Sequence, residues 1–400
     1  MTRKTNTVHQ PVFINGSDLS ISTLAILKAD GSLHEGAQAP ALERELALKI
    51  YRTMVFTRIL DERMVAAQRQ GRLSFYLTCS GEEAAVAGSV AAFDAADMIM
   101  GQYREQAALR FRGFTAKQFM GQLLSNCNDL GKGRQMPVHY GCRDLNWMTI
   151  SSPLATQIPQ AAGYAYGQKL EAERNGSEQL CTLCYYGEGA ASEGDFHAGM
   201  NMAAVLKCPV VFFCRNNGYA ISTPTEEQFA GDGIASRGVG YGIKTIRVDG
   251  NDLLAVYAAS VAARKLAIEL CEPVLIEAMS YRLGAHSTSD DPSGYRSREE
   301  EDRWREQDPI GRFRLWLEQQ QWWSEAEEKA LLEEYRAQVL AELKLEEKQP
   351  PPPLQDLISD VYDTPPWHLQ EQYENLREHM RKYPDHYPTD ADSPAGKGSH

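Results

Sequence analysis

The segment CYYGEGAASEGDFH, residues 184–197, ends an apolar run by placing one carboxylate, Glu188, between two glycines. The run before it, LCTLCYY, has the composition of a buried strand, and SEGDFHAGMNMAAVLK after it has the composition of a helix. We expect Ser192 to cap that helix. Glu188 then stands where a strand turns into a helix. A strand–turn–helix corner with a solvated glutamate would give the same short pattern.

A second strand ends in polar residues that fit the first. The run PVVFFC is followed by RNNGY, so Asn217 follows Glu188 after one helix and one strand. A right-handed crossover brings the carboxyl ends of both strands to the same sheet edge, where α/β proteins bind ligands. Neighbouring strands lie about 4.8 Å apart, and carboxylate, amide and carbonyl oxygens suit Mg²⁺. We therefore expect a magnesium site here, beside glycines and helix amides that admit a diphosphate.

This pattern is not a Rossmann fingerprint, because Ser192 stands where the third glycine is required. The expected strands are LCTLCYY, PVVFFC, IKTIRV and PVLIEAMSY, interleaved with three helices of roughly 15 residues each. Such alternation predicts an α/β fold with a central, mostly parallel sheet flanked by helices. The expected organisation is an extended N-terminal arm (1–40), an α/β domain (41–300) with a helical entry (41–150) and a core (150–300), charged helices (301–349), and a proline linker with a tail (350–400). Ser324 and Glu327 predict a capping box in the third of these parts.

Composition excludes several classes of protein. The chain has 400 residues and is 43% hydrophobic, which is enough for one large core, and its formal net charge of −13 argues against nucleic-acid binding. No apolar run approaches the roughly 20 residues that cross a bilayer. The N-terminus has neither a secretory signal nor a convincing presequence, so we expect a bacterial cytoplasm rather than a mitochondrial matrix. Cys181 and Cys184 have the spacing of half a zinc site, but no second pair follows, and core packing is expected.

The GEG…NN pattern resembles the thiamine-diphosphate motif, which usually begins GDG. The match continues through SFYLTCSGEEA, GQYREQ, GKGRQMPVHYG, ISSPLATQIPQAAG, EGDFHAGMN, CRNNGYAISTPT, IRVDGND, YRLGAHSTSDDPSGYRS and SDVYDTPP. Over about residues 45–388 these resemble the E1 α subunits of branched-chain 2-oxoacid dehydrogenase complexes. NNGYAISTPT and HSTSDDPSGYR look branched-chain rather than pyruvate-type, and glutamate at position 188 is usual in the branched-chain members.

The resemblance implies a set of cofactor ligands. Glu188, Asn217 and the Tyr219 carbonyl would hold Mg²⁺, and the forked guanidinium groups of Arg104 and Arg215 would bind the diphosphate of the cofactor. The remaining implied cofactor-binding residues are Gln102, Tyr103, Ser152, Leu154, Gly189, Ala190 and His286, with Ser152 and Leu154 at the aminopyrimidine.

Further implied roles lie in two polar segments. A structural K⁺ would bind Ser151, Pro153, Thr156 and Gln157, although a proline-punctuated helix start gives the same sequence. A lone histidine in a loop is usually a surface residue, but the resemblance gives His286 an acid–base role beside the thiazolium, where a pKa near neutrality is useful. Implied loop-ordering residues are Arg282, Asp290, Tyr295 and Arg296, and Ser287 and Ser297 match serines that are phosphorylated in mitochondrial relatives.

The implied activity is oxidative decarboxylation of branched-chain 2-oxoacids such as 3-methyl-2-oxobutanoate, in valine, leucine and isoleucine catabolism, with acyl transfer to the lipoyl group of an E2 acyltransferase. Glu188 is committed to the metal, so the glutamate that protonates the aminopyrimidine must come from a β subunit. The resemblance therefore implies an α₂β₂ heterotetramer with each cofactor between an α and a β chain. Alternatives are a pyruvate or acetoin dehydrogenase E1 α subunit, and a non-catalytic scaffold; the intact metal and phosphate positions and His286 argue against the scaffold.

Overall fold

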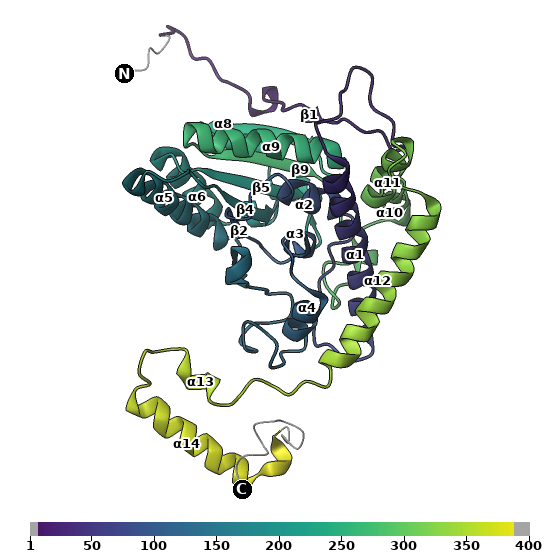
Figure 1. Ribbon diagram of the computed structural model, residues 1–400. Helices are drawn as coiled ribbons and strands as arrows, with labels where there is room; N and C mark the ends of the chain where they lie inside the picture. The colour runs from purple at the N-terminus through teal and green to yellow at the C-terminus, as the bar shows by residue number, and fades with distance from the viewer. Residues whose placement is uncertain (1–6, 388–400) are drawn as a thin grey trace.

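The protein, in a computed structural model that describes residues 7–387, is built on a seven-stranded parallel sheet with helices on both faces (Figure 1). The strand order is β1-β8-β9-β5-β4-β2-β3, and every pairing is parallel. The strands are β1 Thr23–Leu24, β2 Met98–Met100, β3 Trp147–Met148, β4 Thr182–Gly187, β5 Val210–Asn216, β8 Lys244–Asp249 and β9 Val274–Met279. The predicted α/β fold is confirmed.

Burial on both faces explains why the central strands are almost continuously apolar. Alternate residues of a strand point to opposite faces, and in β4 Leu183 and Tyr185 pack in one core cluster while Cys184 and Tyr186 pack in the other. Helices α2 Glu83–Val90, α3 Gln106–Phe111 and α9 Leu253–Leu270 contribute to the first cluster, and α5 Gln157–Asn175 and α6 Gly194–Leu206 to the second. A parallel sheet covered on both faces produces such runs.

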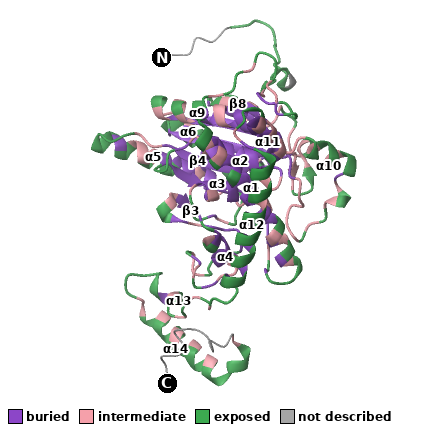
Figure 2. Cartoon of the chain, turned by 45° about the vertical axis from the view of Figure 1, so that its right-hand side comes forward, coloured by how far each residue is buried: buried purple, intermediate pink, exposed green. Residues whose placement is uncertain are grey.

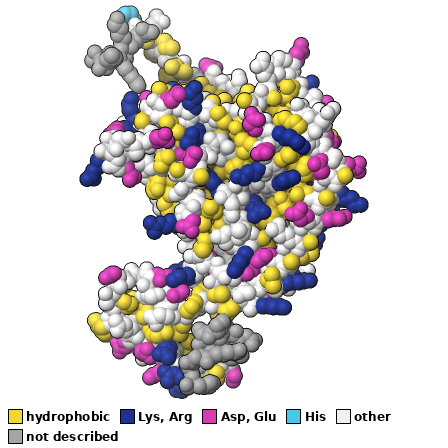
Figure 3. Space-filling model, in the orientation of Figure 1, with side chains coloured by type: hydrophobic (Ala, Val, Ile, Leu, Met, Phe, Trp, Pro, Cys, Tyr) yellow, Lys and Arg dark blue, Asp and Glu magenta, His cyan; other side chains and the backbone are white. Residues whose placement is uncertain are grey.

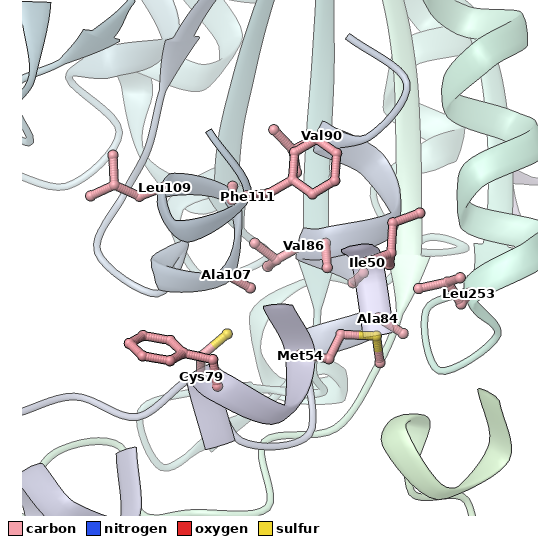
Figure 4. Close-up of a cluster of buried hydrophobic side chains, with 14 of the residues drawn as sticks. Ile50, Met54, Cys79, Ala84, Val86, Val90, Ala107, Leu109, Phe111 and Leu253 are labelled. Atoms are coloured by element: carbon pink, nitrogen blue, oxygen red, sulfur yellow. The ribbon is translucent and has the colours of Figure 1, made fainter. Parts of the chain in front are cut away.

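The first cluster also joins the sheet to the N-terminal helix. Helix α1 Arg44–Arg69 packs on α2 and α3, and Figure 4 shows Ile50 and Met54 from α1 meeting Ala84 and Val86 from α2. Leu253, at the start of α9, lies at the edge of the same group. These contacts fix the N-terminus of α2 against the body of the protein.

The other helices lie around this core. They are α4 Ala116–Leu123, α7 Thr225–Gln228, α8 Ala235–Gly240, α10 Arg298–Arg305, α11 Pro309–Gln319, α12 Glu325–Glu346, α13 Asp356–Ser359 and α14 Trp367–Lys382, and a small hairpin pairs β6 Tyr219–Ala220 with β7 Thr223–Pro224. The N-cap of α12 is Ser324, as predicted, and its hydroxyl oxygen accepts from the Glu327 amide. Figure 2 shows α13 and α14 as a largely exposed extension below the buried core, and α14 has no buried residue.

The structure corrects two details of the predicted elements. Ser192 does not cap α6, because residues 190–192 form a separate 3₁₀ turn and Glu193 takes the N-cap position without a side-chain bond. Long helices fill two of the three gaps between the predicted strands, but the gap between β5 and β8 holds only the β6–β7 hairpin and the short α7 and α8. Several turns in this gap contain glycine, which interrupts a long helix.

The predicted arm and tail are only partly described, because residues 1–6 and 388–400 lie outside the described part of the chain. Within the arm, Thr23 and Leu24 pair with β8 as an edge strand, and Leu27 is fully buried. In the tail, the Pro350 carbonyl accepts from the Cys127 amide. The domain boundaries themselves remain predictions.

The surface charges and the cysteines of the described chain can be compared with what the composition predicts. Acidic and basic side chains are mixed over the face seen in Figure 3. Among the described helices, none combines the length and apolarity needed to span a bilayer. Cys181 and Cys184 are free and buried, and no group of three or more His, Cys, Asp or Glu residues in the described chain could hold a metal.

Candidate active site

A cavity of about 360 Å³ opens at the carboxyl ends of β4 and β5. With one exception, Ser152, every predicted cofactor-binding residue lines it. Its lining is Gln102, Tyr103, Arg104, Leu154, Gly187, Glu188, Gly189, Ala190, Glu193, Arg215, Asn217, Tyr219, Ala220, Ile221, Arg282 and His286. Residues from five separate parts of the sequence therefore meet where an open α/β sheet binds its ligands.

The two strand ends meet as the parallel register requires. Gly187, the last residue of β4, pairs with Arg215 of β5, so the next residues along each chain come together. The Asn217 amide donates to Glu188 Oε2 over 3.3 Å. Glu188 is 1% exposed, and its second oxygen, Oε1, is buried without a hydrogen-bond partner in the described structure. Burial raises the pKa of this carboxyl to about 7.

An unpartnered buried carboxylate oxygen costs free energy unless a cation or donor meets it. Two further oxygens lie in the same turn. Asn217 Oδ1 accepts from the Tyr219 amide over 3.2 Å, with Gly218 at φ +85° between them. Pro224 pairs with Tyr219 in the hairpin and has no N–H, so it cannot occupy the Tyr219 carbonyl. This carboxylate, amide and carbonyl set fits Mg²⁺.

Close packing explains why glycine follows Glu188. A Cβ at Gly189 would lie 2.7 Å from the Cβ of Ala220. A larger residue would push the hairpin away from the end of β4 and separate Glu188 from Asn217. Glycine at position 189 therefore allows the end of β4 and the β6–β7 hairpin to pack closely together.

Two buried arginines supply positive charge to the cavity. Arg104 and Arg215 are 2% and 1% exposed. Arg215 pairs through Nη1 with Glu82 at 2.6 Å and through Nη2 with Glu105 at 2.5 Å. Arg104 donates through Nη1 to the Thr78 carbonyl over 2.6 Å. Both guanidinium groups are fixed by these contacts, and Arg215 Nε is buried without a hydrogen-bond partner in the described structure.

His286 lies against Arg104. Its Nδ1 is 3.2 Å from Arg104 Nη2, and its carbonyl accepts from the same nitrogen. Arginine only donates, so Nδ1 is the acceptor and the neutral ring carries its proton on Nε2. Burial, followed by Arg104 and Arg282, lowers the pKa of His286 to about 4. This lies below the near-neutral pKa expected from the sequence, and a phosphate beside these arginines would raise it.

The four residues predicted to order the histidine loop form one connected network. Asp290 Oδ2 accepts from the His286 amide over 2.7 Å and from the Tyr295 hydroxyl over 2.6 Å. Arg282 donates to Tyr295 over 3.0 Å, and Arg296 donates to the Arg282 carbonyl over 2.5 Å. The backbone of His286 is thereby tied to a carboxylate that is itself fixed by a neighbouring ring.

The remaining predicted residues lie close to this cavity without lining it. Ser152 Oγ is 2.9 Å from His139 Nε2, while Thr156 donates to the Pro153 carbonyl over 3.0 Å and Gln157 donates to the Tyr185 carbonyl over 3.0 Å. Gln157 begins α5, and Ser151 is half-buried just before it. Thr156, the N-cap of α5, makes no side-chain capping bond, and a bound K⁺ at this segment stays a proposal.

The two predicted phosphorylation positions differ in their surroundings. Ser287 lines a second cavity of about 190 Å³ on the other side of the histidine loop, where its hydroxyl oxygen accepts from the Ser289 amide. Ser297 is exposed and caps α10, accepting from the Glu300 amide over 3.1 Å. A phosphate on either would therefore replace a local backbone contact.

Sequence reasoning missed three residues that support the site. Glu82 and Glu105 flank Arg215, and Glu105 also accepts from the backbone amides of Gln102 and Tyr103. His139 contacts Ser152. The acidic pair in CSGEEA was an available signal, since glutamates inside an apolar segment are buried only when paired.

These features define a parallel α/β protein whose sheet edge carries a cavity lined by a buried carboxylate and two buried arginines. The chain belongs to the dehydrogenase E1 component family, whose model matches residues 51–355. It is 50% identical over 382 residues to the human 2-oxoisovalerate dehydrogenase subunit alpha, mitochondrial, covering 95% of this chain and 84% of the relative. The corresponding Dictyostelium discoideum protein is 51% identical (92% and 83% covered), and the Arabidopsis thaliana subunit alpha 2 is 47% identical (94% and 79% covered).

The predicted resemblance to branched-chain E1 α subunits is thus confirmed, and family membership implies thiamine diphosphate and a β subunit. The predicted compartment is wrong. The relatives that match are named as mitochondrial proteins, which contradicts the expected bacterial cytoplasm. The N-terminal composition was too weak a signal to decide the compartment.

Proposed function

We propose that this chain is the α subunit of an E1 enzyme that oxidatively decarboxylates branched-chain 2-oxoacids, with 3-methyl-2-oxobutanoate (2-oxoisovalerate) as a substrate, and passes the acyl group to a lipoyl group on E2. The observation that carries the proposal is the unpartnered Oε1 of Glu188 in the cavity beside Asn217 and two buried arginines. The names of relatives at about half identity supply the substrate class.

In this proposal the chain binds thiamine diphosphate through its diphosphate and a Mg²⁺ ion. Glu188, Asn217 and the Tyr219 carbonyl hold the cation, and Arg104 and Arg215 bind phosphate oxygens. When bound, the cofactor supplies the carbanion chemistry of decarboxylation. The neutral His286, with its proton on Nε2, would donate a hydrogen bond from that nitrogen in the cavity.

The site is completed by a second chain. Leu154 and Ile221 line the cavity and are exposed, at 37% and 53%. We assign their cover to the β subunit of an α₂β₂ heterotetramer, which would also contribute the acid for the aminopyrimidine. A K⁺ ion at residues 151–157 belongs to the same proposal.

The test is substrate choice in the reconstituted heterotetramer. We expect kcat/KM for 3-methyl-2-oxobutanoate to exceed that for pyruvate by at least about tenfold, because a branched alkyl group adds hydrophobic burial of roughly 1–3 kcal/mol. Equal or higher kcat/KM with pyruvate would contradict the branched-chain assignment. Absence of any thiamine diphosphate and Mg²⁺ binding in calorimetric titration would favour the scaffold.

A further inference from the structure

A buried carboxylate behind the site, Glu82, joins two groups that face the cavity. It precedes α2 and is fully buried. Its Oε2 pairs with Arg215 Nη1 at 2.6 Å, and its Oε1 accepts from Asn217 Nδ2 over 2.7 Å. Arginine only donates, so both oxygens of Glu82 act as acceptors in these two contacts, and Glu82 faces Arg215 and Asn217 as a carboxylate.

This contact decides which end of the Asn217 amide enters the site. An amide has a donor end and an acceptor end of similar size, and either could face the cavity. Glu82 can only accept, so Nδ2 turns toward it and Oδ1 turns the other way, where it takes the Tyr219 amide and keeps a lone pair free. A cation requires that oxygen, and a reversed amide would present an NH₂ group to it instead.

We propose that Glu82 is a positioning residue for the cation site: it fixes the oxygen of Asn217 toward the metal and holds Arg215 in the same contact. The proposal rests on the magnesium site proposed above. Because one carboxylate contacts both Asn217 and Arg215, Glu82 would also fix the distance between the cation ligand and the arginine that binds the diphosphate.

The placement of Glu82 depends on the residue before it. Gly81 has φ +93°, and a Cβ there would collide with the carbonyl of Tyr281. The backbone of residue 81 thus packs directly against the segment after β9. This contact leaves Glu82 at the N-terminus of an eight-residue helix, where the helix dipole also favours its charge.

The adjacent residue provides a matched control. Glu83 is also fully buried, but it pairs with Arg58 at 2.5 Å and accepts from the Gly81 amide, away from the cavity. Glu83→Gln removes the same charge from the same helix without touching Asn217. A purely structural role for Glu82 would make the two glutamine variants behave alike.

Three variants distinguish a role of Glu82 in orienting Asn217 from a general loss of stability. In Glu82→Gln, the oxygen of the introduced amide keeps Arg215, so the NH₂ group faces Asn217 and turns that amide over. In Asn217→Asp, two carboxylates face each other. In the double variant E82Q/N217D, the amide introduced at position 82 donates to the carboxylate introduced at position 217, and an oxygen again faces the cation.

The measurement is Mn²⁺ affinity, by electron paramagnetic resonance of the α₂β₂ enzyme with saturating thiamine diphosphate. We expect E82Q to weaken Mn²⁺ binding by about 10- to 100-fold, E83Q to bind as the unaltered enzyme does, and E82Q/N217D to bind at least about tenfold more tightly than N217D. If E82Q does not assemble, N217D and the double variant carry the comparison.

Unchanged affinity in E82Q, or a loss in the double variant as large as the two single losses combined, would overturn the positioning role. Failure of the unaltered enzyme to bind Mn²⁺ would be a different result. It would remove the proposed cation site, and the inference with it.

Discussion

The buried carboxylate of Glu188 lowers the stability of the folded protein unless a cation binds to it. Its folded-state pKa of about 7 lies above the value of an exposed glutamate, so the folded protein holds the proton more tightly than the unfolded chain. The resulting penalty is absent at low pH, grows as pH rises toward 7 and is complete above it. A bound cation would offset this penalty.

We therefore expect Glu188→Gln to raise the melting temperature of the metal-free, cofactor-free heterotetramer at pH 8, with a gain in stability of about 1–3 kcal/mol. The gain should shrink toward pH 5, where the carboxyl is protonated. The same variant should lose the stabilisation that Mg²⁺ with thiamine diphosphate gives the unaltered enzyme. Thermal scans at both pH values, with and without ligands, check this, and a variant still stabilised by Mg²⁺ would contradict the ligand role.

At the scale of single residues, sequence patterns predict partners within the sheet better than partners across the packed layers. Glu188 and Asn217 could be paired because each lies just beyond a strand, and parallel strands end together. Glu82 could not be paired with them, because its partners depend on how α2 approaches the sheet. The low pKa of His286 could not be predicted from the sequence either. It results from burial and from the charges of Arg104 and Arg282, which are brought close to the ring only by the fold.

Polar contacts connect the residues of the segment between β9 and α10. Tyr295 bonds to both Asp290 and Arg282 through one hydroxyl, and Asp290 holds the His286 amide. Hydrogen bonds to charged groups contribute roughly 1.5–3 kcal/mol each. Loss of this hydroxyl should loosen the loop without changing the cavity walls.

We expect Tyr295→Phe to lower kcat/KM about tenfold and to increase hydrogen exchange across residues 284–295. The exposed Tyr362 provides the control, since Tyr362→Phe should leave both unchanged. Exchange mass spectrometry of the heterotetramer measures the effect. Unaltered protection of the loop in Tyr295→Phe would show that the network does not order it.

Backbone contact, rather than backbone angle alone, holds the start of α2. Gly81 and Gly71 have φ values of +93° and +74°, but a Cβ at Gly71 meets nothing within 4 Å. Gly71→Ala should cost about 1 kcal/mol, from its left-handed conformation alone. Gly81→Ala should cost at least about 2 kcal/mol more, measured by chemical denaturation, because Tyr281 must also move. Equal losses would contradict the close approach.

Elements were predictable where they were long and periodic. The strands at 182–187, 210–216, 244–249 and 274–279 and the helix at 44–69 match runs that the sequence marks clearly. Strands β1, β2 and β3 have only two or three residues each, too few to show a period, and are set by their neighbours in the sheet. Ser192 was misplaced because a 3₁₀ turn intervenes before α6.

As a whole molecule, the chain carries the cavity that we propose for the cofactor. The cavity has exposed apolar residues at its rim, and α14 extends from the core with no buried residue. We propose that the β subunit covers the exposed apolar residues at the cavity. The N-terminal segment at residues 1–40 could be predicted only by composition, because it shows no sustained hydrophobic period.

We expect the isolated chain to show no measurable decarboxylation, and activity to appear on addition of the β subunit in an equal ratio of chains. Sedimentation and turnover measured on the same samples test this. Full turnover by the α chain alone would contradict the shared site. The control is E83Q, which should assemble and support turnover as the unaltered chain does.

The proposed cation site is tested most directly by an anomalous diffraction map from crystals of the α₂β₂ enzyme grown with Mn²⁺ and thiamine diphosphate. We expect a manganese peak at the ends of β4 and β5, bound by Glu188 Oε1 and Asn217 Oδ1 and by phosphate oxygens of the cofactor. A peak elsewhere, or a cofactor whose diphosphate lies away from Arg104 and Arg215, would contradict it.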